Sequence, residues 1–286
     1  MRRILVLGGT GWLGREIARR AHESGAEVVC LARGESGPAP DGVRLVRADR
    51  SLAGAYEGLG GEWDDVVELA SEPQLVESAL KALAARAAHW TLVSTVSVYA
   101  DNSTPGADET AQLVDPQNLA EYPDAKVAAE RASAAELGDR LLIARPGLIA
   151  GPGDPSDRLG YWPARLHRGG NVLAPMMSQR FVQFIDVEDL ADWIVSAGAA
   201  GIAGVVNAVG EVHTMEDFFR AHGRSPGSTA NSSRLTTKSS SLSTCIIGPA
   251  PGLSRYGCRS RPRALPSERE APSLPQEVGR DRSLTP

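Results

Sequence analysis

Tyr122 and Lys126 stand four residues apart in the segment EYPDAKVAAE, residues 121–130. A helix brings positions i and i+4 together on one face, and a proline such as Pro123 is tolerated only near a helix start or at a kink. The tyrosine is therefore expected in the first helical turns, beside a cleft. A nearby ammonium lowers the pKa of a phenol from its usual value of about 10, so that tyrosine can serve as a general acid or base. A surface pair that covers its own helix is the alternative.

The start of the chain predicts a unit of strand, glycine turn, helix and strand that could support such a site. The apolar run RILVLGG predicts a buried parallel strand. The segment that follows places Ile17, Ala18 and Ala21 on one helical face, and Gly25 ends the pattern. AEVVCLAR then predicts a second strand. Within about 33 residues this is a βαβ unit with a right-handed crossover.

The turn of this unit contains Gly8, Gly11 and Gly14 in the pattern GxxGxxG. Glycine permits a positive φ and a close approach of pyrophosphate to the backbone, while the following helix start carries partial positive charge. A plain tight turn is the alternative, but its place between a strand and a helix favours dinucleotide binding. Trp12 and Leu13, within the same turn, are included in the predicted cofactor site.

Four further motifs follow the glycine turn in order, so that the five together extend from residue 4 to about residue 195. The GxxGxxG spacing resembles that of the short-chain dehydrogenases/reductases, and the later motifs resemble their extended epimerase/dehydratase branch. The resemblance implies an α/β fold, a doubly wound parallel (Rossmann) sheet with a small C-terminal substrate lobe. The later motifs are HWTLVSTVSVYA, Tyr122-x-x-x-Lys126, LLIARPGLIAGPGD and RFVQFIDVEDLADWIV.

The resemblance implies a catalytic set of Thr95, Tyr122 and Lys126. Thr95 would hydrogen-bond the substrate oxygen, Tyr122 would transfer the proton, and Lys126 would favour the phenolate and bind the nicotinamide ribose. Thr95 is 27 residues before Tyr122, close to the interval of the family. A β-branched strand filler is the alternative for Thr95, and Ser94 and Ser97 compete for its role.

The end of the second predicted strand bears on the choice of dinucleotide. Ala32 occupies the position at which NAD-type members carry an acid, and Arg33 follows. A guanidinium suits a 2′-phosphate, so NADP(H) is favoured over NAD(H); a solvated loop residue is the alternative for Arg33. Asp49 matches the position that binds the adenine amino group, although it could equally be a turn former. The remaining implied cofactor contacts are Leu69, Ala70, Ser71, Pro146 and, beside its catalytic role, Tyr122.

The sequence departs from the family pattern at several positions. Ala125 replaces a small hydroxyl residue before the lysine, and Asp186 replaces a histidine in the late segment. The family arginine that binds nucleotide sugars falls near Val182, with Arg180 as a possible substitute. A uridine or thymidine diphosphate sugar is therefore doubtful as substrate.

Substrate specificity is expected from lobe segments around residues 150–180 and 205–223, within a dinucleotide-binding domain of residues 1–223. The first segment contains Tyr161, Trp162, Met176 and Met177, which either line an apolar pocket or form the core of the lobe.

The last 63 residues, 224–286, differ in composition from the rest. They hold 13 serines, 8 prolines, ten Arg/Lys and only four Asp/Glu, while the whole chain has a net charge of −5. Without apolar periodicity, this tail is expected to be irregular or disordered. A natural basic tail, a loosely packed extension and a shifted reading frame near residue 225 are the three interpretations, and the last is favoured.

The overall composition excludes several function classes. The chain has 286 residues, 42% of them hydrophobic, but no apolar run long enough to span a membrane. Its three cysteines show no metal-ligand or disulfide spacing, and its five histidines show no ligand spacing. These features predict a cytoplasmic protein, monomer or homodimer, with no metal site, no membrane partner and no nucleic-acid partner.

The function predicted from the sequence is an NADP(H)-dependent oxidoreductase, NAD being possible, that acts on a small carbonyl/alcohol substrate. The alternatives are an NAD(P)-dependent epimerase or dehydratase of a sugar-like substrate, and a non-catalytic nucleotide-binding scaffold. A dehydratase would be helped by an acidic pair after the hydroxyl residue, and STVSV offers none.

Overall fold

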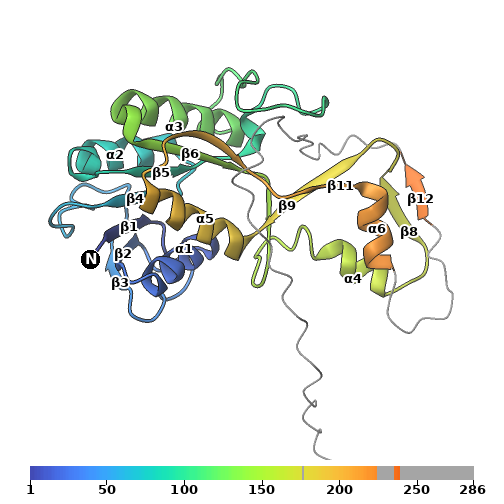
Figure 1. Ribbon diagram of the computed structural model, residues 1–286, viewed down its shortest axis with the longest axis horizontal. Helices are drawn as coiled ribbons and strands as arrows, with labels where there is room; N and C mark the ends of the chain where they lie inside the picture. The colour runs from blue at the N-terminus through green and yellow to red at the C-terminus, as the bar shows by residue number, and fades with distance from the viewer. Residues whose placement is uncertain (176, 224–234, 239–286) are drawn as a thin grey trace, which may run out of the picture. The chain divides into compact units, whose positions relative to one another are not determined.

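The computed structural model describes residues 1–175, 177–223 and 235–238. Its largest sheet has seven strands in the order β3-β2-β1-β4-β5-β6-β10, and all neighbouring strands run parallel (Figure 1). The first six follow the order of dinucleotide-binding sheets, so the predicted doubly wound sheet is confirmed. The strands are β1 (Arg3–Leu7), β2 (Glu27–Ala32), β3 (Arg44–Arg47), β4 (Asp65–Glu68), β5 (Trp90–Val93), β6 (Leu141–Pro146) and β10 (Gly204–Ala208).

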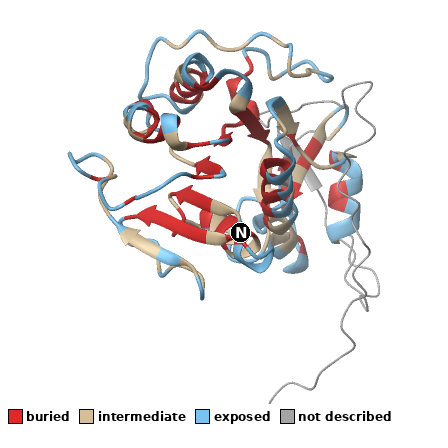
Figure 2. Cartoon of the chain, turned by 60° about the vertical axis from the view of Figure 1, so that its left-hand side comes forward, coloured by how far each residue is buried: buried red, intermediate tan, exposed pale blue. Residues whose placement is uncertain are grey.

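Helices cover both faces of this sheet, and the alternation of side chains along the strands explains why (Figure 2). On β1, Ile4 and Val6 join a core cluster with α1 (Trp12–Glu23) and α5 (Val187–Ala200). Leu5 and Leu7 point the other way, to a cluster with α2 (Pro73–Leu83) and α3 (Tyr122–Leu137). A strand that is apolar on both sides is thereby buried on both sides.

The first βαβ unit forms as predicted. Helix α1 buries Ile17, Ala18 and Ala21, and Gly25 follows it with φ of +89°. Short 3₁₀ turns η1 (Ala84–Arg86) and η3 (Gly138–Arg140) follow α2 and α3.

The fifth strand is shorter than the sequence predicts. β5 ends at Val93, and a 3₁₀ turn η2 (Val96–Val98) replaces its expected continuation. The Thr95 hydroxyl accepts a hydrogen bond from the Ser97 backbone N–H at 3.2 Å, which caps this turn in place of strand pairing.

A smaller lobe is built from the insertion after β6, from residues 212–223 and from residues 235–238. Its core includes Leu166, Val182, Met215, Phe218 and Phe219. Its elements are β7 (Leu148–Ala150), α4 (Tyr161–His167), β8 (Val172–Pro175), β9 (Phe181–Asp186), β11 (Val212–Thr214), α6 (Met215–Gly223) and β12 (Leu235–Lys238). β9 lies between β11 and β7, and β8 pairs with β12.

Two segments differ from the expected domain plan. Strand β10 falls in the segment expected to belong to the lobe, but it pairs with β6 in the large sheet. Within the tail expected to be irregular, residues 235–238 form β12, parallel to β8. The rest of the tail, and with it the proposed frame change near residue 225, lies outside the described residues.

Candidate active site

A cleft of about 1580 Å³ lies where the strands of the large sheet end. Its lining includes the last residues of β1, β2, β5 and β6, which are Leu7, Ala32, Val93 and Pro146. Carboxyl ends of parallel strands are the usual ligand-binding edge of such a sheet. The lining contains every site residue predicted from the sequence, namely Gly8, Gly11, Trp12, Leu13, Gly14, Arg33, Asp49, Leu69, Ala70, Ser71, Thr95, Tyr122, Lys126 and Pro146.

The glycine turn leaves room for a phosphate group against the backbone. Gly8 has φ of +94°, and a Cβ added to Gly14 would lie 2.4 Å from the carbonyl oxygen of Gly8. A Cβ on Gly11 would meet nothing closer than 3.5 Å, so that side is open. Helix α1 starts at Trp12 without a side-chain cap, which leaves first-turn N–H groups without an intrahelical partner. The turn therefore fits the pyrophosphate of a dinucleotide.

Gly9 is a part of the turn that the sequence analysis missed. A Cβ on Gly9 would lie 2.2 Å from the sulfur of Cys30 on β2. The turn is thus pressed against the neighbouring strand. The sequence could have indicated this role, because Gly9 is the second glycine of GGTGWLG and the GxxGxxG pattern does not account for it.

Trp12 uses its side chain to contact the protein itself. Its indole Nε1–H donates to the carbonyl oxygen of Pro152 at 2.9 Å. Pro152 lies in the loop after β7, so this bond ties the start of α1 to the chain that leads into the lobe. A cofactor contact of Trp12 stays a prediction for its backbone N–H and its exposed ring face.

At the end of β2, Arg33 is exposed and pairs with Glu35, with 3.1 Å between guanidinium nitrogen and carboxylate oxygen.

Asp49 accepts hydrogen bonds on one oxygen from the backbone N–H and hydroxyl of Ser51, at 2.9 and 2.7 Å. Chiefly because of that hydroxyl, the pKa of Asp49 is lowered. The turn-former interpretation of Asp49 thus holds, while its second oxygen is left for an adenine amino group.

Tyr122 begins α3 and interacts with Thr95 across the cleft. Residue Tyr122 is 47% exposed, but protein atoms crowd its phenol, and this desolvation raises its pKa. Thr95 and Arg158 act in the opposite direction and lower the pKa of Tyr122, Thr95 through its neighbouring hydroxyl and Arg158 through its charge. The hydroxyl of Ser94 donates to buried Glu130 instead, which removes Ser94 as a competitor for the role of Thr95.

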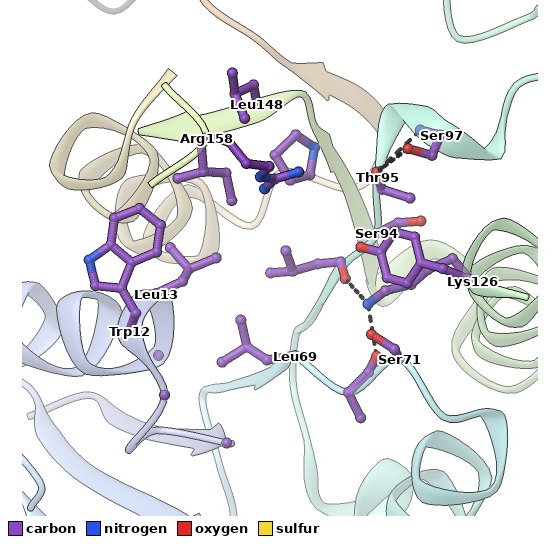
Figure 3. A pocket seen from close by; sticks show the side chains of 18 of the residues that line it. Trp12, Leu13, Leu69, Ser71, Ser94, Thr95, Ser97, Lys126, Leu148 and Arg158 are labelled. Carbon is purple, nitrogen blue, oxygen red and sulfur yellow. Dashed lines mark hydrogen bonds between the residues drawn. The ribbon is translucent and has the colours of Figure 1, made fainter. Parts of the chain in front are cut away.

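Lys126 differs from the expectation that it lowers the pKa of Tyr122. Its ammonium donates to the carbonyl oxygens of Ala70 and Val93, at 2.8 and 2.7 Å (Figure 3), and lies 6.0 Å from the Tyr122 ring centroid. Burial lowers the pKa of Lys126 itself to about 8. The cation whose charge favours the phenolate is instead Arg158, which the sequence analysis missed because no family motif contains it.

Buried Arg50 and Glu68 support the carbonyl that holds Lys126. The carboxylate of Glu68 accepts from two nitrogens of Arg50, one at 2.9 Å, and from the backbone N–H of Ala70 at 2.8 Å. The Arg50 and Glu68 side chains are only 8% and 0% exposed. The pair therefore fixes the segment after β4 at which Lys126 is anchored.

A second buried network lies behind Thr95. Arg145 contacts both carboxylate oxygens of Glu130, at 3.0 and 2.6 Å, and donates to the Tyr99 hydroxyl at 2.9 Å. Tyr99 in turn donates to Asn207 on β10 at 2.7 Å. The network joins the end of η2, α3, β6 and β10, which lie around Thr95, Lys126 and Pro146. The sequence could have indicated this network through Glu130. Glu130 follows Lys126 by four residues and therefore lies on the same helical face.

The lobe side of the cleft is apolar with two arginines. Trp162 and Met177 pack against the lobe core, whereas Tyr161 is 54% exposed. Tyr161 and Trp162 also line the cleft, so both alternatives of the sequence analysis apply to this group; Met176 lies outside the described residues. Arg158 and Arg180 line the same side, and Figure 3 shows the Arg158 side chain directed into the cavity.

The two family positions that differ in the late segment have structural uses. Val182 is buried in the lobe core. Its uncharged side chain cannot replace the arginine that the family has near this position. Asp186 caps α5 by accepting from the backbone N–H of Glu188 at 2.7 Å. Arg180, the possible substitute, does reach the cleft.

In the part of the chain that the structure describes, no helix is long and apolar enough to cross a membrane.

The chain matches the family model described as "NAD dependent epimerase/dehydratase family" in two segments, residues 4–79 and 52–209. It is 30% identical over 236 residues to dTDP-6-deoxy-L-talose 4-dehydrogenase (NAD(P)(+)) of Kitasatospora kifunensis, covering 73% of each chain.

Solved structures share the fold at lower identity. UDP-glucose 4-epimerase of Thermus thermophilus, in complex with NAD, has a TM-score of 0.62 at 18% identity, with 87% of this chain and 90% of that chain covered. The enzyme WbmG of Bordetella bronchiseptica, in complex with NAD and UDP, has a TM-score of 0.65 at 17% identity, with 87% and 85% covered.

These relatives confirm the predicted family resemblance and the nicotinamide cofactor class at family level. They support the alternative of a sugar-like substrate better than the main prediction of a small carbonyl compound.

Proposed function

Because the chain belongs to the NAD dependent epimerase/dehydratase family, we propose that it oxidises a carbinol carbon of a sugar nucleotide, or reduces the corresponding carbonyl carbon, with the help of NAD(P). The observation that carries the proposal is the set Thr95, Tyr122 and Lys126 in one cleft with the glycine turn. A substrate carbon held between the Thr95–Tyr122 pair and the nicotinamide site would be placed for proton transfer at its oxygen.

Four groups of this chain would hold the dinucleotide. The glycine turn and the start of α1 would bind the pyrophosphate, and Arg33 favours a 2′-phosphate at the adenosine end. Lys126 has three N–H donors and spends two on Ala70 and Val93. Its third donor would bind a nicotinamide ribose hydroxyl, and the orientation of the ammonium is fixed before the ligand arrives. When bound, the nicotinamide ring supplies the hydride acceptor or donor.

Side chains of the protein itself would donate or accept the proton and would position the substrate oxygen for that transfer. Tyr122, whose pKa is raised by desolvation, is a phenol at neutral pH. It can therefore donate a proton to the oxygen of a carbonyl that is being reduced, while Thr95 holds that oxygen by a hydrogen bond. Oxidation of the alcohol needs the phenolate, so its rate should rise as the pH increases above neutrality. Arg158 would favour the phenolate through its charge.

The lobe side supports a nucleotide-linked substrate. Arg158 and Arg180 line the cleft, and their guanidinium groups would bind a diphosphate in place of the family arginine whose position falls near Val182. Exposed Tyr161 offers an aromatic face for a base. Val96 and Ser97 follow Thr95, where a dehydratase would be helped by an acidic pair. A dehydrogenase or epimerase is therefore favoured over a dehydratase.

The test is turnover of dTDP- and UDP-linked hexoses and 6-deoxyhexoses with NAD⁺ and NADP⁺. Nicotinamide absorbance detects release of reduced cofactor by a dehydrogenase, and NMR of the sugar detects inversion by an epimerase. Tyr122→Phe should lower turnover by about 10²–10⁴-fold while cofactor affinity stays within about twofold. Turnover of the variant within a few-fold of the wild type would overturn the proposed proton transfer. Nucleotide binding without turnover of any of these sugars would support the non-catalytic scaffold instead.

A further inference from the structure

Residues 151–160 form the loop between β7 and α4, and this loop contacts both sides of the cleft. At its start, the carbonyl oxygen of Pro152 accepts a hydrogen bond from the indole Nε1–H of Trp12 at 2.9 Å. Near its end, the Arg158 side chain is directed into the cavity (Figure 3). We propose that Trp12 is a positioning residue, whose indole holds this loop so that the guanidinium of Arg158 faces Tyr122. The consequence for catalysis rests on the proposed function, because Tyr122 is the group that transfers the proton there.

The first end of the loop is fixed by packing as well as by the hydrogen bond. A Cβ added to Gly153 would lie 3.6 Å from Nε1 and 3.7 Å from Cδ1 of Trp12, so the backbone passes directly along the indole. A Cβ added to Gly151 would lie 2.7 Å from a methyl group of Val187, at the start of α5. Trp12 itself begins α1 immediately after the glycine turn. The loop is therefore held against two helices at the end nearest the glycine turn.

A series of short-range hydrogen bonds extends from this end of the loop to Arg158. The backbone N–H of Asp154 donates to the carbonyl oxygen of Gly151 at 3.2 Å. The Asp154 carboxylate accepts from the backbone N–H and the hydroxyl of Ser156, at 2.8 and 2.7 Å. Arg158 then donates from Nε to the hydroxyl oxygen of Ser156 at 3.1 Å. Because each bond joins residues only two or three apart, a displacement at Pro152 would also displace Arg158.

The position of Arg158 matters because of the groups that face the phenol of Tyr122. These groups are Thr95 at the start of η2, Lys126 on the same helix and Arg158 on the loop. Desolvation raises the pKa of Tyr122, whereas the hydroxyl of Thr95 and the charge of Arg158 lower it. The Lys126 ammonium is held by two backbone carbonyl groups, so Arg158 is the charge whose distance from the phenol depends on the loop. A Coulomb interaction weakens with distance, and a loop released from Trp12 would therefore favour the phenolate less.

The experiment is a titration of the full chain, labelled with ¹³C at Cζ of its five tyrosines, followed by NMR from about pH 8 upward. The signal of Tyr122 is identified by its absence from Tyr122→Phe. Trp12→Phe keeps the ring but removes the donor, and it should lower the ionisation constant of Tyr122 about two- to threefold. Arg158→Gln removes the charge and should lower the constant by about threefold or slightly more. Adding Trp12→Phe to Arg158→Gln should then change nothing further.

Trp193→Phe is the matched control. Trp193 packs against the core cluster of α1 and α5, outside the cleft lining, so this variant should keep the ionisation constant of Tyr122 in the wild type. An unchanged constant in Trp12→Phe would mean that the indole only stabilises the fold, and would overturn the inference. The same decrease in Trp193→Phe, or a further decrease when Trp12→Phe is added to Arg158→Gln, would also overturn it.

The titration needs no substrate, so its result is independent of the test of the proposed function. If no dTDP- or UDP-linked sugar is turned over, the proposed function fails, whereas the titration still decides whether Trp12 positions Arg158. Where a sugar is oxidised, the increase of kcat/KM with pH should move to higher pH in Trp12→Phe and in Arg158→Gln alike. A pH profile of Trp12→Phe that coincides with that of the wild type would contradict the positioning role.

Discussion

The large sheet and the small lobe hold their side chains by different means. The large sheet has ion pairs that are buried beside its strands, such as Glu130 with Arg145, whose side chains are 5% and 4% exposed. In the lobe, the pair of Arg220 with Asp217 has side chains that are 59% and 58% exposed. The lobe core relies on ring contacts instead, such as Trp162 with Phe219, whose ring centroids are 4.9 Å apart.

The difference corresponds to what each region has to do. Buried, fully hydrogen-bonded charges specify geometry, because any displacement leaves a charge uncompensated. Aromatic packing specifies volume and shape but tolerates substitution of one apolar side chain by another. The sheet side therefore suits the fixed positions that proton transfer requires, and the lobe side suits a pocket that adapts to its substrate.

The largest predicted effect separates the two kinds of ion pair directly. Arg145→Met leaves Glu130 buried without its partner and should lower the free energy of unfolding by about 3–5 kcal/mol. Arg220→Met removes an exposed pair and should change it by less than about 1 kcal/mol. Urea unfolding of both variants measures the contrast. Equal losses would show that the two regions do not differ in this way.

Lys126 gives the sheet region a characteristic dependence on pH. Burial lowers its pKa from 10.5 to about 8, so between these values the unfolded chain keeps a proton that the folded chain has lost. Stability relative to Lys126→Met should therefore rise by about 3 kcal/mol as the pH increases from about 8 to 10.5. The full penalty of the buried charge applies below pH 8.

The measurement is denaturant unfolding across that pH range, with Lys81→Met as control. Lys81 is exposed on α2, so its removal should leave the pH dependence unchanged. A wild type whose stability runs parallel to that of Lys126→Met over the whole range would contradict the prediction.

Two glycines of the same turn should separate folding from binding. Gly14→Ala brings a methyl group to 2.4 Å from a backbone oxygen and should lower stability by about 2–3 kcal/mol. Gly11 has φ of −69° and open space, so Gly11→Ala should stay within about 0.5 kcal/mol of the wild type. Its methyl group would nevertheless occupy the space for the pyrophosphate and weaken cofactor binding. Thermal unfolding measures the stability of both variants, and cofactor titration measures their binding. Cofactor affinity equal to that of the wild type in Gly11→Ala would mean that the pyrophosphate does not bind beside Gly11.

The smallest predicted effect concerns the bond that links the two regions. Trp12→Phe removes the donor to Pro152 but keeps an aromatic ring, and the bond is exposed to water. The loss of stability should therefore be about 0.5–1 kcal/mol, measured by urea unfolding. A loss of stability above about 2 kcal/mol would contradict this prediction and would mean that packing of the two regions depends on this bond.

The sequence predicted well where a short pattern dictates backbone geometry. The glycine turn, the strand alternation of residues 4–7 and the helix start at Tyr122 follow from local rules for φ, burial and proline. The partners of Lys126 could not be predicted, because they are the carbonyl groups of Ala70 and Val93, which no side-chain pattern marks. Arg158 was missed for a related reason: it lies in an insertion, and only tertiary folding brings it to Tyr122.

The contact between Gly9 and Cys30 makes the thiol an internal reporter of loop opening. Cys30 is fully buried, and desolvation raises its pKa to about 12, so an alkylating reagent can reach a reactive thiolate only after the turn has lifted off β2. The rate at which Cys30 is alkylated, followed on the peptide that contains it, would measure how often the turn opens. A ligand that clamps the turn should slow that rate without touching the sulfur.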